Sequence, residues 1–183
     1  MTAEAASASA SRTSRHWSHY VIMAVALTMS LYHLYVAFFG APDAQVFRAV
    51  HILFALLLAF LIYPTSPSGR LERPGILSVV LIALSIAACA YQYFAKEVID
   101  ARMIYVDDLT PEQWWLGIIF IVVVLEGTRR VLGLVMPITA LLFLGYALFV
   151  HGSTPQEVVE QMYLTTDGIL GIPVAVSATY VVL

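Results

Sequence analysis

Long apolar runs follow one another from Trp17 to the end of this chain, and only short polar segments separate them. A helix of about 20 apolar residues crosses the hydrocarbon core of a bilayer, and several of the runs have about that length. Hydrophobic residues make up 61% of the chain and charged residues 11%, against about 25% charged residues in an average soluble domain. The pattern predicts an all-α integral membrane protein and excludes a large water-soluble catalytic domain.

Charge and motifs exclude further classes of protein. The formal net charge is -3, and nowhere do more than two basic residues stand side by side, so a nucleic-acid partner is not expected. The single cysteine, Cys89, cannot form a disulfide within the chain. The sequence holds no H-E-x-x-H, G-x-S-x-G or phosphate-binding glycine motif, and we therefore expect no enzyme activity and no resident cofactor.

Glycine, proline and polar residues divide the chain into membrane segments. We expect a polytopic bundle of about five full membrane helices and the start of a sixth. The Ala/Ser-rich residues 1–16 are predicted to be a disordered cytoplasmic arm. The apolar segments are expected at about 17–39, 44–63, 75–94, 111–125, 131–150 and 169–183.

Two connections differ from the other turns. Residues 64–74, with three prolines and a glycine, are predicted to be a loop. The longest polar connection, 96–112, is expected to contain a short interfacial helix.

Three sites carry the residues that typically begin a helix. Asp43 is predicted to be the N-cap of the second helix. Thr110-Pro111-Glu112-Gln113 has an N-cap threonine, proline at the first helical position and a capping-box residue at the third. Thr154-Pro155-Gln156-Glu157 repeats the arrangement.

The distribution of lysine and arginine predicts the orientation. With the N-terminus in the cytoplasm, six of the nine basic residues face inward: Arg12, Arg15, Arg70, Arg73, Arg129 and Arg130. The other three are Arg48, Lys96 and Arg102, and we expect Arg48 to extend toward the outer surface rather than to bind a solute. The acid-rich connection then faces outward, and Asp100, Asp107 and Asp108 become candidates for contact with a partner protein.

The last apolar run ends at Leu183 without a polar flank. We therefore expect the chain to be the N-terminal portion of a longer polytopic protein.

Two groups of polar residues fall inside membrane segments. His33 and His51 are expected on facing helices, where they could ligate a haem iron or make an interhelical hydrogen bond. In the third helix Ser78, Ser85, Cys89 and Gln92 share one face, which is typical of a helix-packing seam and compatible with a solute path.

Two further groups occur near helix ends. Glu126 with Arg129 and Arg130 has the i, i+3 and i, i+4 spacing of a local ion pair, and we expect it to anchor a helix at the inner interface. Gly171 and Pro173, followed by Ser177, lie in an apolar run. They indicate either a simple helix start or a broken helix of the kind that forms solute and ion sites in transporters. The sequence does not identify a metal ligand.

Two stretches resemble the fused permease of TRAP transporters, in the branch that works with TAXI-type binding proteins. They are Leu125–Gly133, followed by Pro137 and Tyr146, and Tyr163–Tyr180, which is the more specific of the two. The segment His51–Pro64 also resembles the second helix of that group.

The resemblance implies a secondary transporter in a bacterial or archaeal cytoplasmic membrane, coupled to an ion gradient, usually sodium. An extracytoplasmic binding protein would deliver a small organic acid. Residues 17–128 would form the small four-helix domain, a scaffold, and 129–183 the beginning of a large transport domain that moves in an elevator-like manner. Gly171, Pro173 and Ser177 are the candidates for its solute or ion path. The alternatives are a membrane haem protein that uses His33 and His51, and a membrane scaffold or sensor without transport activity.

Overall fold

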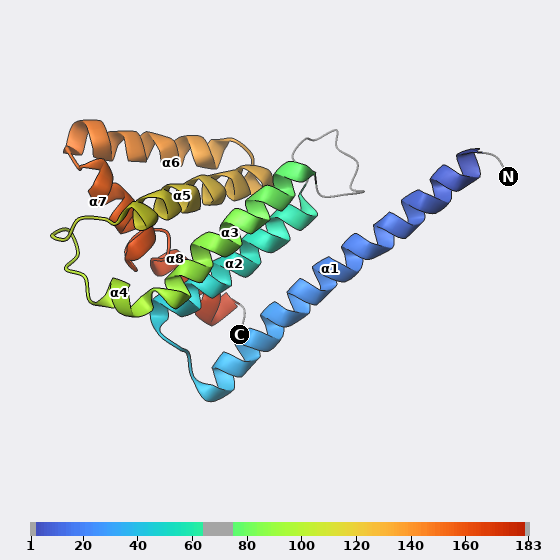
Figure 1. The fold of residues 1–183 in the computed structure, drawn as a ribbon, viewed down its shortest axis with the longest axis horizontal. Helices are drawn as coiled ribbons and strands as arrows, with labels where there is room; N and C mark the ends of the chain where they lie inside the picture. Colours follow the sequence, from blue (N-terminus) through green and yellow to red (C-terminus); the bar gives the residue numbers. More distant parts are fainter. Residues whose placement is uncertain (1–2, 64–74, 182–183) are drawn as a thin grey trace.

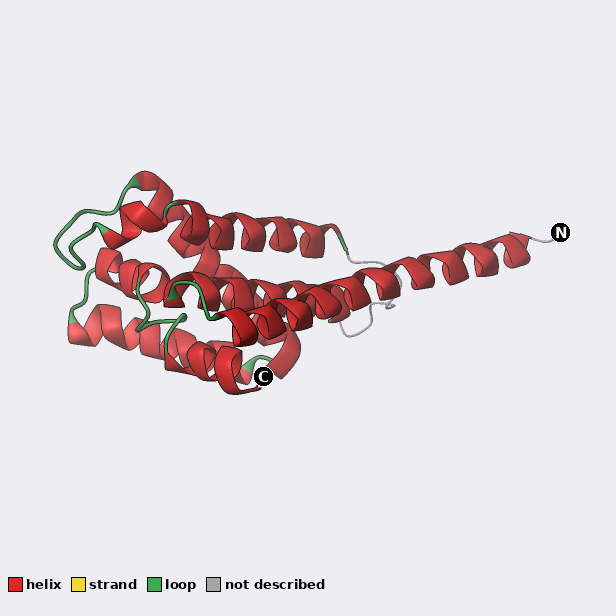
Figure 2. Ribbon diagram, turned by 90° about the horizontal axis from the view of Figure 1, so that it is seen from below, coloured by secondary structure: helices red, strands yellow, loops and turns green. Residues whose placement is uncertain are grey.

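The computed structural model describes residues 3–63 and 75–181, and within these ranges it is helical without a strand (Figures 1 and 2). The all-α prediction is confirmed. In chain order the elements are α1 (Ala3–Phe39), α2 (Ala44–Ile62), α3 (Ile76–Phe94), α4 (Lys96–Asp100), α5 (Pro111–Leu132), α6 (Val135–Tyr146), η1 (Ala147–His151), α7 (Pro155–Val159), η2 (Glu160–Leu164), α8 (Ile172–Val176) and η3 (Ser177–Val181). The three η elements are π-helices, which usually occur as single turns and often at functional sites.

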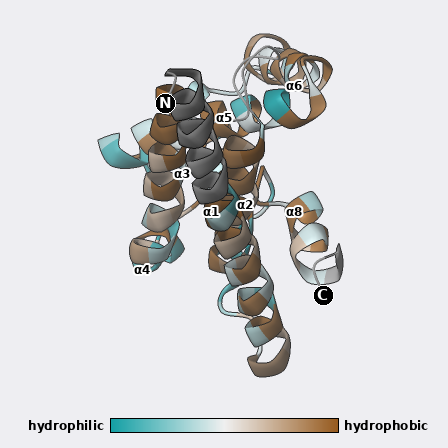
Figure 3. Cartoon of the chain, turned by 90° about the vertical axis from the view of Figure 1, so that its right-hand side faces the viewer, coloured by the Kyte–Doolittle hydropathy of each residue, from teal (hydrophilic) through white to brown (hydrophobic). Residues whose placement is uncertain are grey.

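Three helices of the described chain are long and apolar enough to cross a membrane: His19–Phe39 within α1, Ala44–Ile62 and Ile76–Phe94. A shorter apolar helix covers Val135–His151. Hydrophobic residues dominate α3, α5 and α6 in Figure 3. The three long helices, within α1, α2 and α3, have the length and composition that the sequence predicts for a membrane protein.

The predicted helix starts are confirmed. The Asp43 carboxylate accepts hydrogen bonds from the backbone N–H groups of Gln45 and Val46. Complete capping boxes, with Thr110 and Thr154 as N-caps, begin α5 and α7. Each box satisfies two backbone donors that a helix start would otherwise leave without partners.

Glycines with positive φ end three of the helical segments. Gly40 follows α1, Gly133 follows α5 and Gly152 follows η1. Since L side chains rarely adopt these backbone angles, glycine at these positions specifies where the chain turns.

Two segments differ from the sequence prediction. The first helix begins at Ala3 rather than near Trp17, because alanine has the highest helix propensity and extending a formed helix needs no new nucleus. Residues 3–16 are therefore helical where we expected disorder. In the last apolar run the helix begins at Ile172 rather than at Ile169, and α8 continues directly into η3. The predicted loop at 64–74, with Arg70 and Arg73, lies outside the described residues.

The core lies where α2, α3 and α5 pack together, and α1 diverges from this bundle toward its N-terminus (Figure 1). The core also contains buried apolar side chains from η2 and from the segment that follows η2. Its buried side chains include Phe60, Leu81, Ala88, Phe120, Tyr163 and Leu170. One core therefore extends across the domain boundary predicted at 128/129, and the packing does not mark that boundary.

Candidate functional site

The chain leaves helical structure at residues 165–171, between the end of η2 and the start of α8, and we call this segment the helix break. Gly168 approaches the preceding turn so closely that an added Cβ would lie 2.1 Å from the carbonyl oxygen of Gln161. A Cβ on Gly171 would lie 2.7 Å from the carbonyl oxygen of Gly168. Both positions require glycine, because backbone atoms cannot move aside as a flexible side chain can.

Side chains of α2 and α3 bind the backbone carbonyls at and beside this break. Gln92 Nε2 donates to the Tyr163 carbonyl at 2.6 Å, and Gln45 Nε2 donates to the Leu164 carbonyl at 3.0 Å. The two amides are themselves joined, since Gln45 Nε2 also donates to Gln92 Oε1 at 2.6 Å. The carbonyls at a helix end have no partner within the helix, and in an apolar medium each unpaired group costs several kcal/mol, of order 2–7.

Arg48 binds carbonyls near both ends of the break. Its Nη1 donates to the carbonyl of Leu170 at 2.9 Å and to that of Thr166 at 3.4 Å. Arg48 is partly exposed, and its extension toward the outer surface stays a prediction. A cation near the carbonyl end of η2 also complements the dipole of that helix end.

A chain of hydrogen bonds joins α1, α2 and η3 next to the break. His33 Nδ1 lies 2.8 Å from the Met29 carbonyl, His33 Nε2 lies 3.0 Å from His51 Nδ1, and His51 Nε2 lies 3.1 Å from Ser177 Oγ. A carbonyl only accepts, so His33 carries its proton on Nδ1 and accepts at Nε2. His51 then donates from Nδ1, and Ser177 donates its hydroxyl proton to His51 Nε2. We call His33, His51 and Ser177 the histidine chain.

This geometry disfavours the two histidines as axial ligands of one iron. Two nitrogens on opposite sides of a metal, each bonded at about 2.0–2.1 Å, lie about 4 Å apart. The facing nitrogens of His33 and His51 are 3.0 Å apart, and both of the other ring nitrogens already have partners. The interhelical hydrogen bond, the other predicted role of this pair, is present.

The three residues predicted to form a solute or ion path lie at the start of the broken run. Gly171 is the N-cap of α8, Pro173 is in its first turn, and Ser177 begins η3. Ser177 belongs to the histidine chain, so it faces α2.

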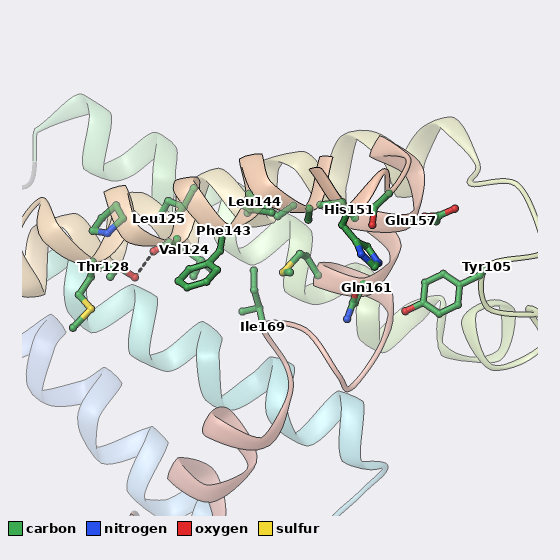
Figure 4. Close-up of a pocket in the computed structure, with 18 residues that line it drawn as sticks. Tyr105, Val124, Leu125, Thr128, Phe143, Leu144, His151, Glu157, Gln161 and Ile169 are labelled. Atoms are coloured by element: carbon green, nitrogen blue, oxygen red, sulfur yellow. Dashed lines mark hydrogen bonds between the residues drawn. The ribbon is translucent and has the colours of Figure 1, made fainter. Parts of the chain in front are cut away.

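A cavity of about 550 Å³ lies on the other side of the break, between α5, α6 and the α7–η2 segment. Figure 4 shows Phe143 and Ile169 between its two ends, with Thr128 at one end and His151 and Gln161 toward the other. Its lining is mainly apolar. Ile169 belongs to the break, so this segment faces α2 on one side and the cavity on the other, whereas Gly171, Pro173 and Ser177 do not line the cavity.

The predicted docking loop is held together by a buried arginine. Arg102 forms an ion pair of 3.1 Å with Glu160, and the two side chains are 9% and 1% exposed. Arg102 also donates to the carbonyls of Asp107 and Asp108 and to Gln113 Oε1. The Tyr105 N–H donates to the other Glu160 oxygen. One arginine and one glutamate thus fix the loop onto η2 and α5.

The three acidic side chains predicted for docking differ in the contacts that their carboxylates make. Asp100 pairs with Lys96, and Asp107 accepts from the Met103 N–H at 2.8 Å. The Asp108 carboxylate has a 3.4 Å contact with Gln156 Nε2 and is exposed. Burial raises the pKa of Tyr105 in this loop, and the negative charges of Asp167, Glu160 and Glu157 add to the effect. Exposed apolar side chains accompany the acids: Met103, Ile104 and Val106.

The predicted ion-pair group at the end of α5 is present. Glu126 accepts from Arg129 at 2.6 and 2.8 Å and from Arg130 at 2.8 Å. Arg130 also donates to Ser78 Oγ at 2.7 Å, and its guanidinium lies over the Phe60 ring. Its side chain is 0% exposed, so the group joins α2, α3 and α5, while its anchoring role at the inner interface stays a prediction.

The packing face predicted on α3 is buried, as expected for a helix seam: Ser78, Ser85, Cys89 and Gln92. Sequence reasoning did not identify Gln45 and Glu160. A polar side chain within an apolar helix was the available signal for Gln45. Glu160 had none, because its partner Arg102 lies 58 positions earlier in the chain.

Within the described residues, no group of three or more histidine, cysteine, aspartate or glutamate side chains could hold a metal ion. Comparison with protein-family models, curated proteins and solved structures gives no match for this chain.

Proposed function

We propose that this chain is the N-terminal part of a TRAP-type permease, a binding-protein-dependent secondary transporter for a small organic acid. The observation that carries the proposal is the helix break, whose carbonyls are bound by Gln92, Gln45 and Arg48. Broken helices of this kind, with irregular backbone stabilised inside the protein, are how many secondary transporters form their sites. The sequence resemblance covers the same segment, Tyr163–Tyr180.

In this proposal the chain crosses the cell inner membrane several times, with about five spans, and its N-terminus is cytoplasmic. The small domain, 17–128, acts as the scaffold, and 129–183 begins the transport domain. Sodium is the proposed coupling ion. The cavity beside Ile169 has a volume within the about 300–1,000 Å³ common for ligand pockets and is a candidate part of the solute path.

The extracytoplasmic partner is proposed to be a TAXI-type binding protein that docks on the 101–110 loop. Its ordered backbone, exposed acids and exposed apolar side chains together provide a surface that a protein partner can bind. A central apolar contact with a polar rim is the usual composition of such interfaces.

Uptake by the intact permease tests this function. The protein encoded by the complete reading frame that contains this chain is reconstituted in proteoliposomes. The secreted binding protein encoded beside it is added. Accumulation of a radiolabelled organic acid should require both the binding protein and an inward sodium gradient, and it should stop when an ionophore removes the gradient. Uptake that needs neither would overturn the proposal, and a haem Soret band in the purified protein would support the haem alternative instead.

A further inference from the structure

We propose that the histidine chain is a proton-binding site that takes up one proton per pair of histidines. His33 and His51 are 1% and 6% exposed, while Ser177 is partly exposed. Ionisable side chains buried within membrane segments are costly, and where they occur they commonly mark ion or proton paths. This pair connects the first two membrane helices with the element that follows the helix break.

In its neutral state the histidine chain is fully hydrogen-bonded. Ser177 donates to His51, His51 donates to His33, and His33 donates to the Met29 carbonyl, so each of the four ring nitrogens has one partner. Because the carbonyl at one end can only accept, all protons point in the same direction along the chain.

The same heavy atoms accommodate one added proton without moving. A proton on His51 Nε2 makes that nitrogen a donor, and the Ser177 oxygen, 3.1 Å away, accepts by turning its hydroxyl hydrogen elsewhere. His51 Nδ1 still donates to His33 Nε2, and His33 Nδ1 still donates to the Met29 carbonyl. Every N–H of the cation therefore has an acceptor, which lowers the cost of burying the charge.

A second proton does not fit. Both facing nitrogens, His33 Nε2 and His51 Nδ1, would then be donors 3.0 Å apart with no acceptor between them. Two positive imidazolium rings would also lie with centroids 5.1 Å apart in an environment of low dielectric. The site thus has a capacity of one.

Among the residues whose side chains the structure describes, no carboxylate pairs directly with this charge. From α1, the Tyr32 ring contacts His33 edge-on, and from α2 the Phe47 ring lies beside it. Arg48 is one turn before His51 on α2, and its cation is directed to the break carbonyls. η3 contributes Ser177, and Asp167 is the acid of the break. The bound proton is stabilised by dipoles, with Arg48 opposing it.

Nuclear magnetic resonance of the intact protein with ¹⁵N-labelled histidine, in lipid nanodiscs, tests the site. We expect both rings to carry their proton on Nδ1 when neutral, with a nitrogen–nitrogen coupling through the His33–His51 hydrogen bond. As the pH is lowered from about 8, the two rings should change together in one step that binds one proton. Separate full protonation of each ring would overturn the proposal, as would a pair still neutral when the exposed His151 is fully charged.

Three variants test the histidine chain independently of the rest of the protein. Ser177→Ala removes the acceptor for the cation, so the shared step should move to lower pH, because hydrogen bonds to charged groups are stronger than neutral ones. His33→Phe should abolish the coupling, while His19→Gln, a change at an exposed position of the same helix, should leave both coupling and step unchanged. A Ser177→Ala step at the unchanged pH would contradict the assigned acceptor.

The consequence for transport rests on the proposed function. If the polypeptide belongs to a permease, sodium-driven uptake should vary with pH over the range in which the two histidines bind their shared proton. His33→Phe should remove that variation. The titration needs no transport. A failed titration therefore counts against the proton site alone, and absent uptake in a protein that titrates as described counts against the permease alone.

Discussion

The guanidinium of Arg48 donates a 2.9 Å hydrogen bond to the backbone carbonyl of Leu170, 122 positions further along the chain. This contact links the start of the second membrane helix to the last residue but one of the helix break. Together with the two glutamine amides, it satisfies backbone groups that would otherwise be buried without partners.

Replacing Arg48 with methionine should destabilise the break. The substitution keeps much of the apolar stem and leaves the Leu170 carbonyl without its donor, at a cost of about 1–3 kcal/mol. We expect faster proteolysis within 165–171 and a lower midpoint in denaturant unfolding monitored by tryptophan fluorescence. Glu97→Gln, at an exposed site on α4, is the control. Equal stability of the Arg48 and Glu97 variants would show that the carbonyls find other partners.

Two glycine substitutions should have opposite effects. Gly168→Ala places a Cβ 2.1 Å from the Gln161 carbonyl oxygen, so the break must rearrange and the protein should lose stability. Gly145→Ala, in α6, meets nothing within 4 Å and should stabilise the helix by about 0.5–1 kcal/mol. Thermal unfolding of the two variants in the same detergent measures the difference. A Gly168→Ala protein as stable as the parent would contradict the close approach.

Breaking the Arg102–Glu160 pair should loosen the 101–110 loop. Both partners are buried, and removing one of them typically costs about 3–5 kcal/mol, because the other charge is left unpaired. Glu160→Gln should therefore increase amide hydrogen exchange across 101–110. The exposed Lys96–Asp100 pair provides the contrast, since Asp100→Asn at such a pair should cost only about 0–1 kcal/mol. Similar exchange in both variants would argue against Arg102 as the residue that orders the loop.

Charge reversal at Asp108 should weaken docking of the binding protein. Asp108→Lys changes the surface charge while the loop backbone keeps its Arg102 contacts, which use the Asp108 carbonyl rather than its carboxylate. Asp107→Lys would also disturb the loop backbone, because the Asp107 carboxylate accepts from the Met103 N–H. The dissociation constant of the binding protein, measured at two salt concentrations, should rise for Asp108→Lys and not for the exposed Glu97→Gln. An unchanged constant would remove this loop from the proposed interface.

Local signals allowed the helix starts to be predicted, because an N-cap and its capping-box partner lie within four residues of each other. The buried face of α3 and the Glu126 ion pairs follow from helical periodicity for the same reason. The partners of Arg48, Gln45 and Glu160 could not be predicted. They are separated in sequence by 47 to 122 positions, and only the packing of the helices determines which of them meet.

The last apolar run shows another limit of the sequence. Apolar length alone does not place the helix start at Ile172 rather than at Ile169. Gly171 and Pro173 indicated a break as one of two interpretations. The close contacts of Gly168 with the preceding turn, which require the break, involve backbone atoms and leave no periodic pattern in the sequence.

Cysteine accessibility in intact cells tests most directly the central claim, that a helix break is held inside a membrane protein by side chains of α2. In a Cys89→Ser background, single cysteines at Asp108, Ser153, Thr166 and Leu170 are treated with a membrane-impermeant maleimide. We predict rapid labelling at 108 and 153, protection at 166 and 170, and loss of that protection when Arg48 is also replaced with methionine. Labelling at 166 and 170 as fast as at 108, with Arg48 intact, would contradict the account.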